Sequence, residues 1–224
     1  GSTLIYATYV GGSSNEYPHS LVVDDDMNLI ILGSTFSTNY PRTPNAYQRK
    51  LVGNSDIVVT KLNPSGRMLI GSTFLGGSDR DGLNEGAIIK FFYADNFRGD
   101  VIADSQGYVY AAMHTRSANF PTAGTPLQPL NAGKQDGVVF KLNPDFSNLE
   151  WSTFLGGSED DALYSIDFDS KGDIYLSGGT RSKDLKGTGN TANPTYRGGA
   201  ADGFIAIISK DGDQILRSTY WGGN

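Results

Sequence analysis

The chain has 224 residues, a formal net charge of −6 at pH 7 and no cysteine. The acidic balance disfavours nucleic-acid backbones and anionic membrane surfaces as partners, because both are bound mainly through Lys and Arg. The absence of cysteine excludes disulfide bonds and thiolate metal sites, and no apolar stretch approaches the ~20 residues of a membrane-spanning helix. The 29 glycines, 12 tyrosines and 11 phenylalanines favour an all-β protein of short strands joined by glycine turns.

A six-residue motif recurs four times along the chain. Its copies occupy residues 7–12, 72–77, 152–157 and 218–223, with Ser-Thr-Phe-Leu-Gly-Gly at the two central ones. The threonines stand at positions 8, 73, 153 and 219, so the first and last intervals are nearly equal and the middle one is longer. Self-similarity at such a period indicates a repeat architecture with three full units between the four copies.

Each unit opens with two apolar strands joined by a tight turn. The first strand ends at an aspartate, which is Asp24, Asp104 or Asp169, and the second strand follows at residues 29–32, 109–112 or 174–177. Gly107 and Gly172 close two of these turns, because glycine readily adopts the positive φ that a tight hairpin needs. Met27 takes that place in the first unit, so we expect that turn to differ in detail.

The third strand of each unit begins after Asp56, Asp136 or Asp202, and the glycine-ended motif supplies the fourth. Each of these aspartates stands at the same distance before its threonine (56 to 73, 136 to 153, 202 to 219), so this hairpin has a constant length. Four short strands per unit, joined by two tight turns and two longer loops, predict the blade of a β-propeller rather than a β-sandwich.

These patterns predict an all-β fold of three four-stranded antiparallel blades plus an orphan strand, part of a larger ring. Residues 1–12 are the outer strand of a preceding blade, and residues 13–77, 78–157 and 158–224 are the three blades. Propellers close with ~4 to 8 blades, so the remaining blades must come from the same ring or from a second copy. Gly1 and Ser2 resemble an expression-tag remnant, although Gly1 stands seven residues before Thr8, as Gly66 does before Thr73.

The longer loops carry the variation between units. The step from threonine to turn aspartate is the same in the first and third units (8 to 24, 153 to 169) but longer in the second (73 to 104), which places a fifteen-residue insertion within residues 79–100. Aromatic residues of the insertion and the loops are candidate contacts for a glycan or peptide: Phe91, Phe92, Tyr93, Tyr40, Tyr47, Phe120 and Tyr196. The alternative is that these rings pack the loops onto the blade edges.

Three carboxylates are candidate metal ligands. Glu16, Asp81 and Asp161 each stand four residues after the second glycine of the motif. An acidic ring near the central channel would suit Ca²⁺, which takes six to eight oxygen ligands. The alternative is that each carboxylate accepts backbone N–H bonds between blades, and Asp56, Asp136 and Asp202 favour such a structural role even more.

Four motifs in fixed order carry a family resemblance. They are the Gly-Gly motif, the turn Asp-Ser-x-Gly-x-x-Tyr, the loop Ser-x-Asn-[Tyr/Phe]-Pro at residues 37–41 and 117–121, and Asp-x-x-Val-x-Lys-Leu-Asn-Pro-x-Gly. Together they resemble the seven-bladed β-propeller repeat (SBBP) family of bacteria, over essentially the whole chain. The third unit departs from the pattern at residues 182–185 and at Ile207, which replaces Lys61 and Lys141. The resemblance implies a secreted or cell-surface location and no catalytic residues.

No catalytic constellation is recognisable. His19 and His114 occupy different strand positions and have no thiol partner for zinc, and no Gly-x-Ser-x-Gly elbow is present. We therefore expect a non-catalytic binding, adhesion or scaffold module that holds a protein or glycan on its loop face. The alternatives are a purely structural spacer and a polysaccharide-active hydrolase or lyase with carboxylates such as Asp81 and Asp161 at the channel mouth.

Overall fold

The computed structural model describes residues 2–93 and 96–223, with the side chains of Phe92 and Tyr93 also outside the description. Twelve strands and one helix lie within these residues. The first blade holds β1 (Glu16–Val23), β2 (Leu29–Thr35), β3 (Asp56–Leu62) and β4 (Leu69–Leu75). The second holds β5 (Asp100–Ala103), β6 (Val109–Thr115), β7 (Asp136–Leu142) and β8 (Leu149–Leu155), and the third holds β9 (Asp161–Phe168), β10 (Ile174–Thr180), β11 (Asp202–Ile208) and β12 (Ile215–Trp221).

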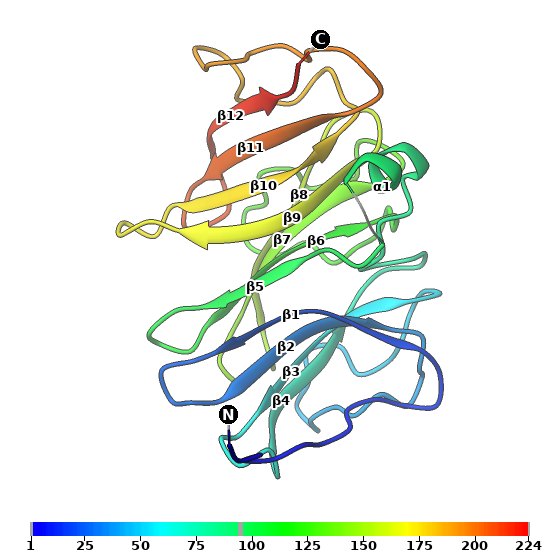
Figure 1. Cartoon of the computed structure of the whole chain (residues 1–224), viewed down its shortest axis with the longest axis vertical. Coiled ribbons are helices and arrows are strands. Elements are labelled where there is room, and N and C mark those ends of the chain that lie inside the picture. The colour runs from blue at the N-terminus through cyan, green and yellow to red at the C-terminus, as the bar shows by residue number, and fades with distance from the viewer. Residues whose placement is uncertain (1, 94–95, 224) are drawn as a thin grey trace.

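Each blade is a four-stranded antiparallel sheet with its strands in chain order. The three sheets stack along the long axis of the molecule, and the innermost strands β1, β5 and β9 lie side by side near its middle (Figure 1). The predicted all-β class and the three four-stranded sheets are therefore confirmed. The chain begins at the end of the stack formed by the first blade and finishes at the end formed by the third.

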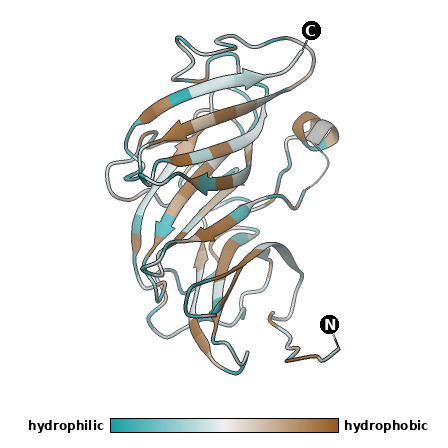
Figure 2. Ribbon diagram, turned by 60° about the vertical axis from the view of Figure 1, so that its left-hand side comes forward, coloured by the Kyte–Doolittle hydropathy of each residue, from teal (hydrophilic) through white to brown (hydrophobic). Residues whose placement is uncertain are grey.

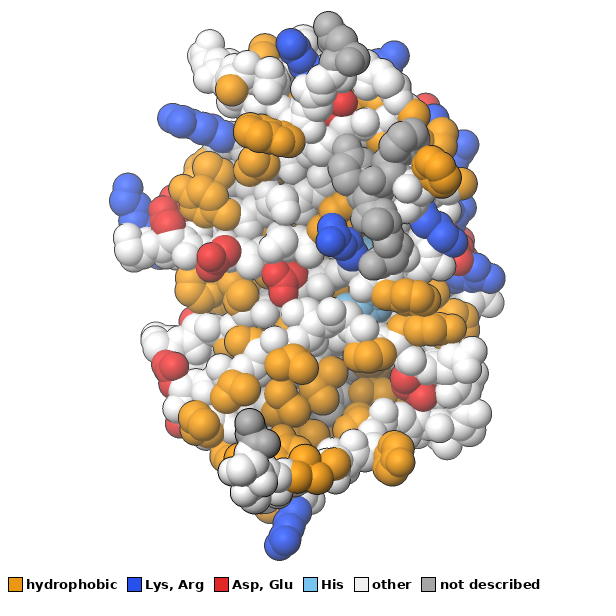
Figure 3. All heavy atoms as spheres, in the orientation of Figure 1, with side chains coloured by type: hydrophobic (Ala, Val, Ile, Leu, Met, Phe, Trp, Pro, Cys, Tyr) orange, Lys and Arg blue, Asp and Glu red, His pale blue; other side chains and the backbone are white. Residues whose placement is uncertain are grey.

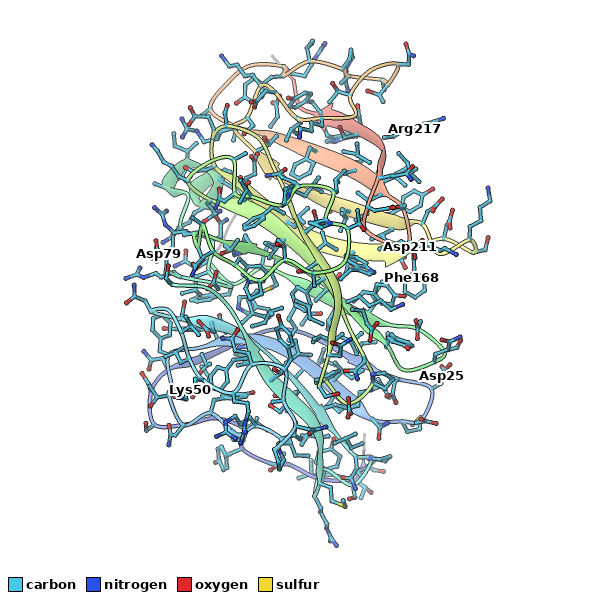
Figure 4. All side chains as sticks on the ribbon, turned by 180° about the vertical axis from the view of Figure 1, so that it is seen from behind. Asp25, Lys50, Asp79, Phe168, Asp211 and Arg217 are labelled. Carbon is cyan, nitrogen blue, oxygen red and sulfur yellow. The ribbon has the colours of Figure 1, made fainter. Side chains whose placement is uncertain are left out.

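The tight turns and the long loops lie at opposite edges of the stack. In Figure 4, Asp25 and Asp211 mark hairpin turns at one edge, whereas Lys50 and Asp79 mark longer connections at the other. Gly107 and Gly172 have φ of 81° and 86°. The expectation that the first turn differs is wrong, because Met27 takes the same left-handed conformation with φ 63° and closes the same hydrogen bond, from its N–H to the Asp24 carbonyl at 2.9 Å.

Apolar side chains fill both junctions between blades. Strand residues alternate between the two faces of a sheet, so Val138 and Phe140 of β7 pack toward the first blade while Val139 packs toward the third. Hydrophobic positions accordingly concentrate along the strands (Figure 2). Each fully buried side chain of this kind contributes about 1.5–3 kcal/mol of stabilisation, so the blade junctions are the main source of stability.

The leading segment does not form the predicted orphan strand, since residues 3–12 carry no strand hydrogen bonding. Leu4, Ile5 and Tyr9 are largely exposed. An outer strand pairs with the third strand of its own blade, and the third strands within the described residues are already paired with β4, β8 and β12. The leading segment therefore finds no unpaired third strand with which it could form a sheet.

The insertion folds into helix α1 (Ala87–Tyr93), which stands beside the sheets at the loop edge (Figures 1 and 2). Within this helix the Ile89 side chain is completely buried, whereas Phe91 is 80 % exposed. No helix of the described residues is long and apolar enough to cross a membrane.

Candidate functional site

The same hydrogen-bond network recurs wherever the chain passes from a Gly-Gly motif into the next blade. We call each copy a latch. In the second latch the Asp81 carboxylate accepts the Gly77 N–H at 2.7 Å and the Ser117 hydroxyl at 3.0 Å, as well as the Thr115 hydroxyl. In the third, Asp161 accepts the Gly157 N–H at 2.6 Å and the Ser182 hydroxyl at 2.7 Å.

The first latch is formed although no strand precedes it. Glu16 accepts the Gly12 N–H and the Thr35 hydroxyl, both at 3.1 Å, and the Ser37 hydroxyl. The Asn39 side chain accepts both the N–H and the hydroxyl of Ser13 at 2.9 Å. Asn119 and Asp184 make the same two bonds in the other latches. This loop position therefore holds the segment that enters each blade against a loop of the same blade.

A second buried carboxylate lies beside the second latch and beside the third. Asp56 accepts the Gln48 side-chain amide at 2.6 Å, and Asp136 accepts that of Gln128 at 2.8 Å. A Cβ on Gly76 would lie 2.6 Å from the Asp56 carboxylate and 2.7 Å from that of Asp81. Glycine is therefore required here by close approach. The paired glutamines are structural residues that were not predicted from the sequence, although both stand at the same distance before the motif threonine (48 to 73, 128 to 153).

Burial dominates the electrostatics of these carboxyl groups. It raises the pKa of Asp81 and of Asp136 to about 7 and that of Asp161 to about 6, against hydrogen bonds that favour the ionised form. It also raises the pKa of Asp56. Such shifts are common at catalytic sites, but each of these carboxyl groups is buried and accepts hydrogen bonds from protein donors, so the geometry supports a structural role.

The predicted acidic ring of Glu16, Asp81 and Asp161 is wrong, because each carboxylate is enclosed in its own latch. Asp81 and Asp161 are completely buried. Within the described ranges no three His, Asp or Glu side chains are grouped so that they could hold a metal ion. The latches match the structural alternative, in which each carboxylate accepts a backbone N–H between blades.

Two of the candidate aromatic contacts are core residues. Tyr40 packs edge-to-face on Phe74 with ring centroids 6.1 Å apart, and Phe120 packs in the same way on Phe154. Tyr40 and Phe120 are only 6 % and 4 % exposed, so the prediction that they contact a ligand is wrong. The physical reason is that each ring fills the gap between its loop and the outer strand of its own blade.

The other described candidates remain at the surface. Tyr47 and Phe91 are exposed, and Tyr196 packs edge-to-face on Tyr220 with a centroid distance of 5.9 Å. The ring contacts of Tyr40, Phe120 and Tyr196 are each with a residue of the outer strand of their own blade. Phe92 and Tyr93 have side chains outside the described set.

A cleft of about 400 Å³ opens at the loop edge between α1 and the third blade, and we call it the loop-face cleft. Of the predicted aromatic contacts whose side chains the structure describes, Tyr196 alone lines it. Lys183 lies 5.8 Å above the Tyr196 ring, and Arg181 pairs with Glu159 at 3.7 Å and Asp160 at 3.6 Å. The remaining lining residues are Ile88, Ser158, Gly199 and Ala200.

A larger cleft of about 710 Å³ lies where the innermost strands meet, and we call it the inner cleft. At its centre the Asp100 carboxylate of β5 accepts the Ser20 hydroxyl of β1 at 2.8 Å and the Ser165 hydroxyl of β9 at 3.0 Å. Charged side chains of both signs gather over β5 and β9 in this part of the surface (Figure 3). One carboxylate therefore bridges three blades.

Two β-bulges point side chains into the inner cleft. His19 is the extra residue of β1 between Pro18 and Ser20, and Tyr164 is the extra residue at the same position of β9. The Asn84 amide of the insertion donates to the Tyr164 hydroxyl at 3.2 Å. Bulges commonly re-aim a side chain next to a functional site.

The insertion supplies one further wall of the inner cleft, and the third blade supplies another through Ser177, Gly178, Gly203, Phe204, Ile205 and Trp221. Phe97 stacks on Tyr17 with ring centroids 4.4 Å apart, and the Arg98 guanidinium lies 5.5 Å from the Tyr164 ring centroid. This site was not predicted from the sequence. Its signal was the shared position of Ser20, Asp100 and Ser165, each four residues before the turn aspartate of its blade.

Comparison with known proteins adds little to this geometry. No protein-family model matches the chain, and no curated protein matches it. Among solved structures, a levansucrase variant of B. megaterium is similar with a TM-score of 0.33 and 11 % sequence identity, over 92 % of this chain and 63 % of the levansucrase chain. The chain thus spans less than two thirds of that protein's length. The fold of this chain is all-β and propeller-like.

Proposed function

We propose that this chain is a run of three blades from a larger β-propeller, and that it serves as a non-catalytic scaffold and binding module. The observation that carries the proposal is the exposed apolar face of the third blade. Residues on this face occupy the positions that are buried between blades elsewhere in the stack. We call it the end face and define it by Tyr175, Ile205 and Trp221.

The repeat allows the exposure of end-face residues to be compared with that of the equivalent residues in the second blade. Tyr175, Ile205 and Trp221 are 40 %, 37 % and 68 % exposed. Their counterparts at the second junction are Tyr110, Val139 and Leu155, which are 8 %, 0 % and 6 % exposed. Isolated apolar residues at a surface are ordinary, but a whole row of junction positions left open is typical of an interaction surface. A further blade, from the same ring or a second copy, fits this face.

The opposite end of the stack supports the same proposal. The leading segment lies against the outer face of the first blade, where Tyr6 and Val10 border a groove of about 330 Å³ with Leu29 and Ile31. The first latch is complete there, as it is at true blade junctions. Figure 3 shows hydrophobic side chains gathered over this end.

Fluorescence of Trp221 tests the ring proposal. Trp151→Phe leaves Trp221 as the sole tryptophan of the chain. We expect strong acrylamide quenching in the 224-residue chain and weak quenching, with a blue-shifted emission, in a longer form that carries further repeats or in a concentrated self-associated sample. Equal quenching in all three samples would contradict the proposal.

For the binding role, the loop-face cleft is the place we propose for a protein or glycan ligand. Tyr196 and Lys183 combine an aromatic surface with a positive charge at a loop edge held by rigid sheets. Screening on glycan and peptide arrays should yield a ligand whose binding falls at least about tenfold in Tyr196→Ala and is retained in Tyr47→Ala. Retention in both variants would exclude the loop-face cleft.

The enzymatic alternative would need an acid–base pair other than Asp81 and Asp161. A hydrolase with two working carboxylates needs them about 5–10 Å apart across one substrate site. Asp81 and Asp161 instead lie in separate latches and line neither cleft. Export to the bacterial cell surface remains part of the proposal and is supported by the sequence resemblance alone, so fractionation of cells that produce the protein is its test.

A further inference from the structure

We propose that the inner cleft binds an acidic sugar, with Arg98 pairing with the sugar carboxylate and the polar groups on the innermost strands meeting its hydroxyls. This site is separate from the loop-face cleft, and it does not depend on the ligand bound there. Its polar elements are one guanidinium, one carboxylate, three serine hydroxyls and two bulge side chains, brought together from all three blades.

Arg98 gives the proposed site its preference for a ligand that carries a carboxylate. Its side chain is exposed at the cleft, and no carboxylate among the described residues lies within ion-pair distance of it. The contact with the Tyr164 ring holds the guanidinium in place and leaves its N–H groups for a ligand. Guanidinium and carboxylate form two parallel hydrogen bonds, which are among the strongest polar contacts available.

Hydroxyl recognition comes from the strand positions around Asp100. The Asp100 carboxylate accepts the Ser20 and Ser165 hydroxyls and the N–H groups of Val101 and Ile166. Its roughly four acceptor sites are therefore filled, and its part in the site is to hold the two serine hydroxyls in place. The two serine oxygens retain lone pairs for a sugar hydroxyl, and the Tyr164 hydroxyl is held at the same wall by Asn84. A mixed array of donors and acceptors suits a polyol better than a purely apolar ligand.

Aromatic rings complete the resemblance to a sugar site. Phe97 and Trp221 line the cleft, with Phe97 stacked on Tyr17 and Trp221 68 % exposed, so the cleft presents aromatic surface to the apolar side of a pyranose ring. Ile205 and Trp221 also belong to the end face, where a further blade would form the adjoining wall. Arg98, Asp100 and Tyr164 stand on the innermost strands or next to them, and the proposed polar contacts use these residues.

The test is a titration of the chain with tri-galacturonate and with neutral galactotriose, at equal ionic strength, by isothermal calorimetry or NMR. Saturable binding of the acidic trimer is expected, with clearly weaker binding of the neutral one. Arg98→Gln should lower the affinity for the acidic trimer at least about tenfold. Arg67→Gln, an exposed arginine on a hairpin turn of the first blade, is the matched control and should bind as wild type.

Three results would overturn the inference: no saturable binding of the acidic trimer, equal binding of both trimers, or unchanged affinity in Arg98→Gln. Asp100→Asn is the second variant, because it keeps the shape of the side chain and is expected to weaken both sugars. If Tyr196→Ala abolishes binding while Arg98→Gln does not, the sugar occupies the loop-face cleft. In that case this inference fails and the proposed binding function stands.

Discussion

Replacing Gly156 by alanine tests whether the Gly-Gly motif is held by close approach to buried carboxylates. The new Cβ would lie 2.6 Å from an Asp136 carboxylate oxygen and 2.8 Å from an Asp161 oxygen. Contacts this short force at least one carboxylate to move. Asp136 would then lose its bonds from the Gln128 amide and the Ala132 N–H, both at 2.8 Å, or Asp161 its bond from Gly157.

The expected cost follows from these contacts. Overpacking costs about 1–3 kcal/mol, and a lost hydrogen bond to a charged group costs about 1.5–3 kcal/mol, so Gly156→Ala should lower the free energy of unfolding by about 3–5 kcal/mol. With a urea m-value of about 3 kcal/mol/M, the denaturation midpoint should fall by about 1–1.7 M. Circular dichroism during urea unfolding measures the change.

Gly189→Ala is the matched control. Nothing lies within 4 Å of a Cβ at Gly189, and its φ is outside the left-handed region. The same substitution should therefore change the stability by less than about 0.5 kcal/mol. If Gly156→Ala unfolds at the wild-type midpoint, the carboxylates are not as closely packed as described and the explanation of the motif is refuted.

Two further predictions concern buried charge. Burial raises the pKa of Asp81 from 3.8 to about 7, so the folded state binds this proton more tightly than the unfolded chain, and its contribution to stability declines as pH rises from about 4 to about 7. The urea midpoint of Asp81→Asn should therefore depend less on pH across this window than that of wild type, and an identical dependence would argue against the shift. Lys61→Met removes the partner of buried Asp24, whose carboxylate lies 3.5 Å from the Lys61 ammonium, and should cost about 3–5 kcal/mol. The double variant with Asp24→Asn should recover most of that loss in the same assay, and an equal loss in both would show that the ion pair is not the cause.

Much of the architecture is readable from local sequence signals. The recurring Gly-Gly motif, the turn aspartates and the constant third hairpin predict three sheets of four strands, and the structure has them. These features depend on residues close together in the chain, since strand alternation and turn chemistry act over a few residues. Met27 is the instructive exception. Its left-handed conformation shows that the hairpin, held by Asp24, dictates the backbone even where glycine is absent.

The role of each candidate residue depended on contacts that local patterns do not encode. Tyr40, Phe120 and Tyr47 are all aromatic residues of long loops, and the sequence does not distinguish them. Tyr40 and Phe120 are buried because their loops pack onto the outer strands, whereas Tyr47 is exposed. The carboxylates Asp81 and Asp161 share a register that fits a cation ring equally well. Whether a carboxylate is enclosed by donors or free for a ligand depends on where the neighbouring blade places its hydroxyls.

The sequence by itself determined the repeat, the strand order and the position of the insertion. Only the tertiary structure decided that the acidic residues form latches, that the end face is open, and that Ser20, Asp100 and Ser165 meet in one cleft. These three residues are 80 and 65 positions apart along the chain. They meet because blade stacking, driven by burial of the apolar faces, aligns equivalent positions of the innermost strands.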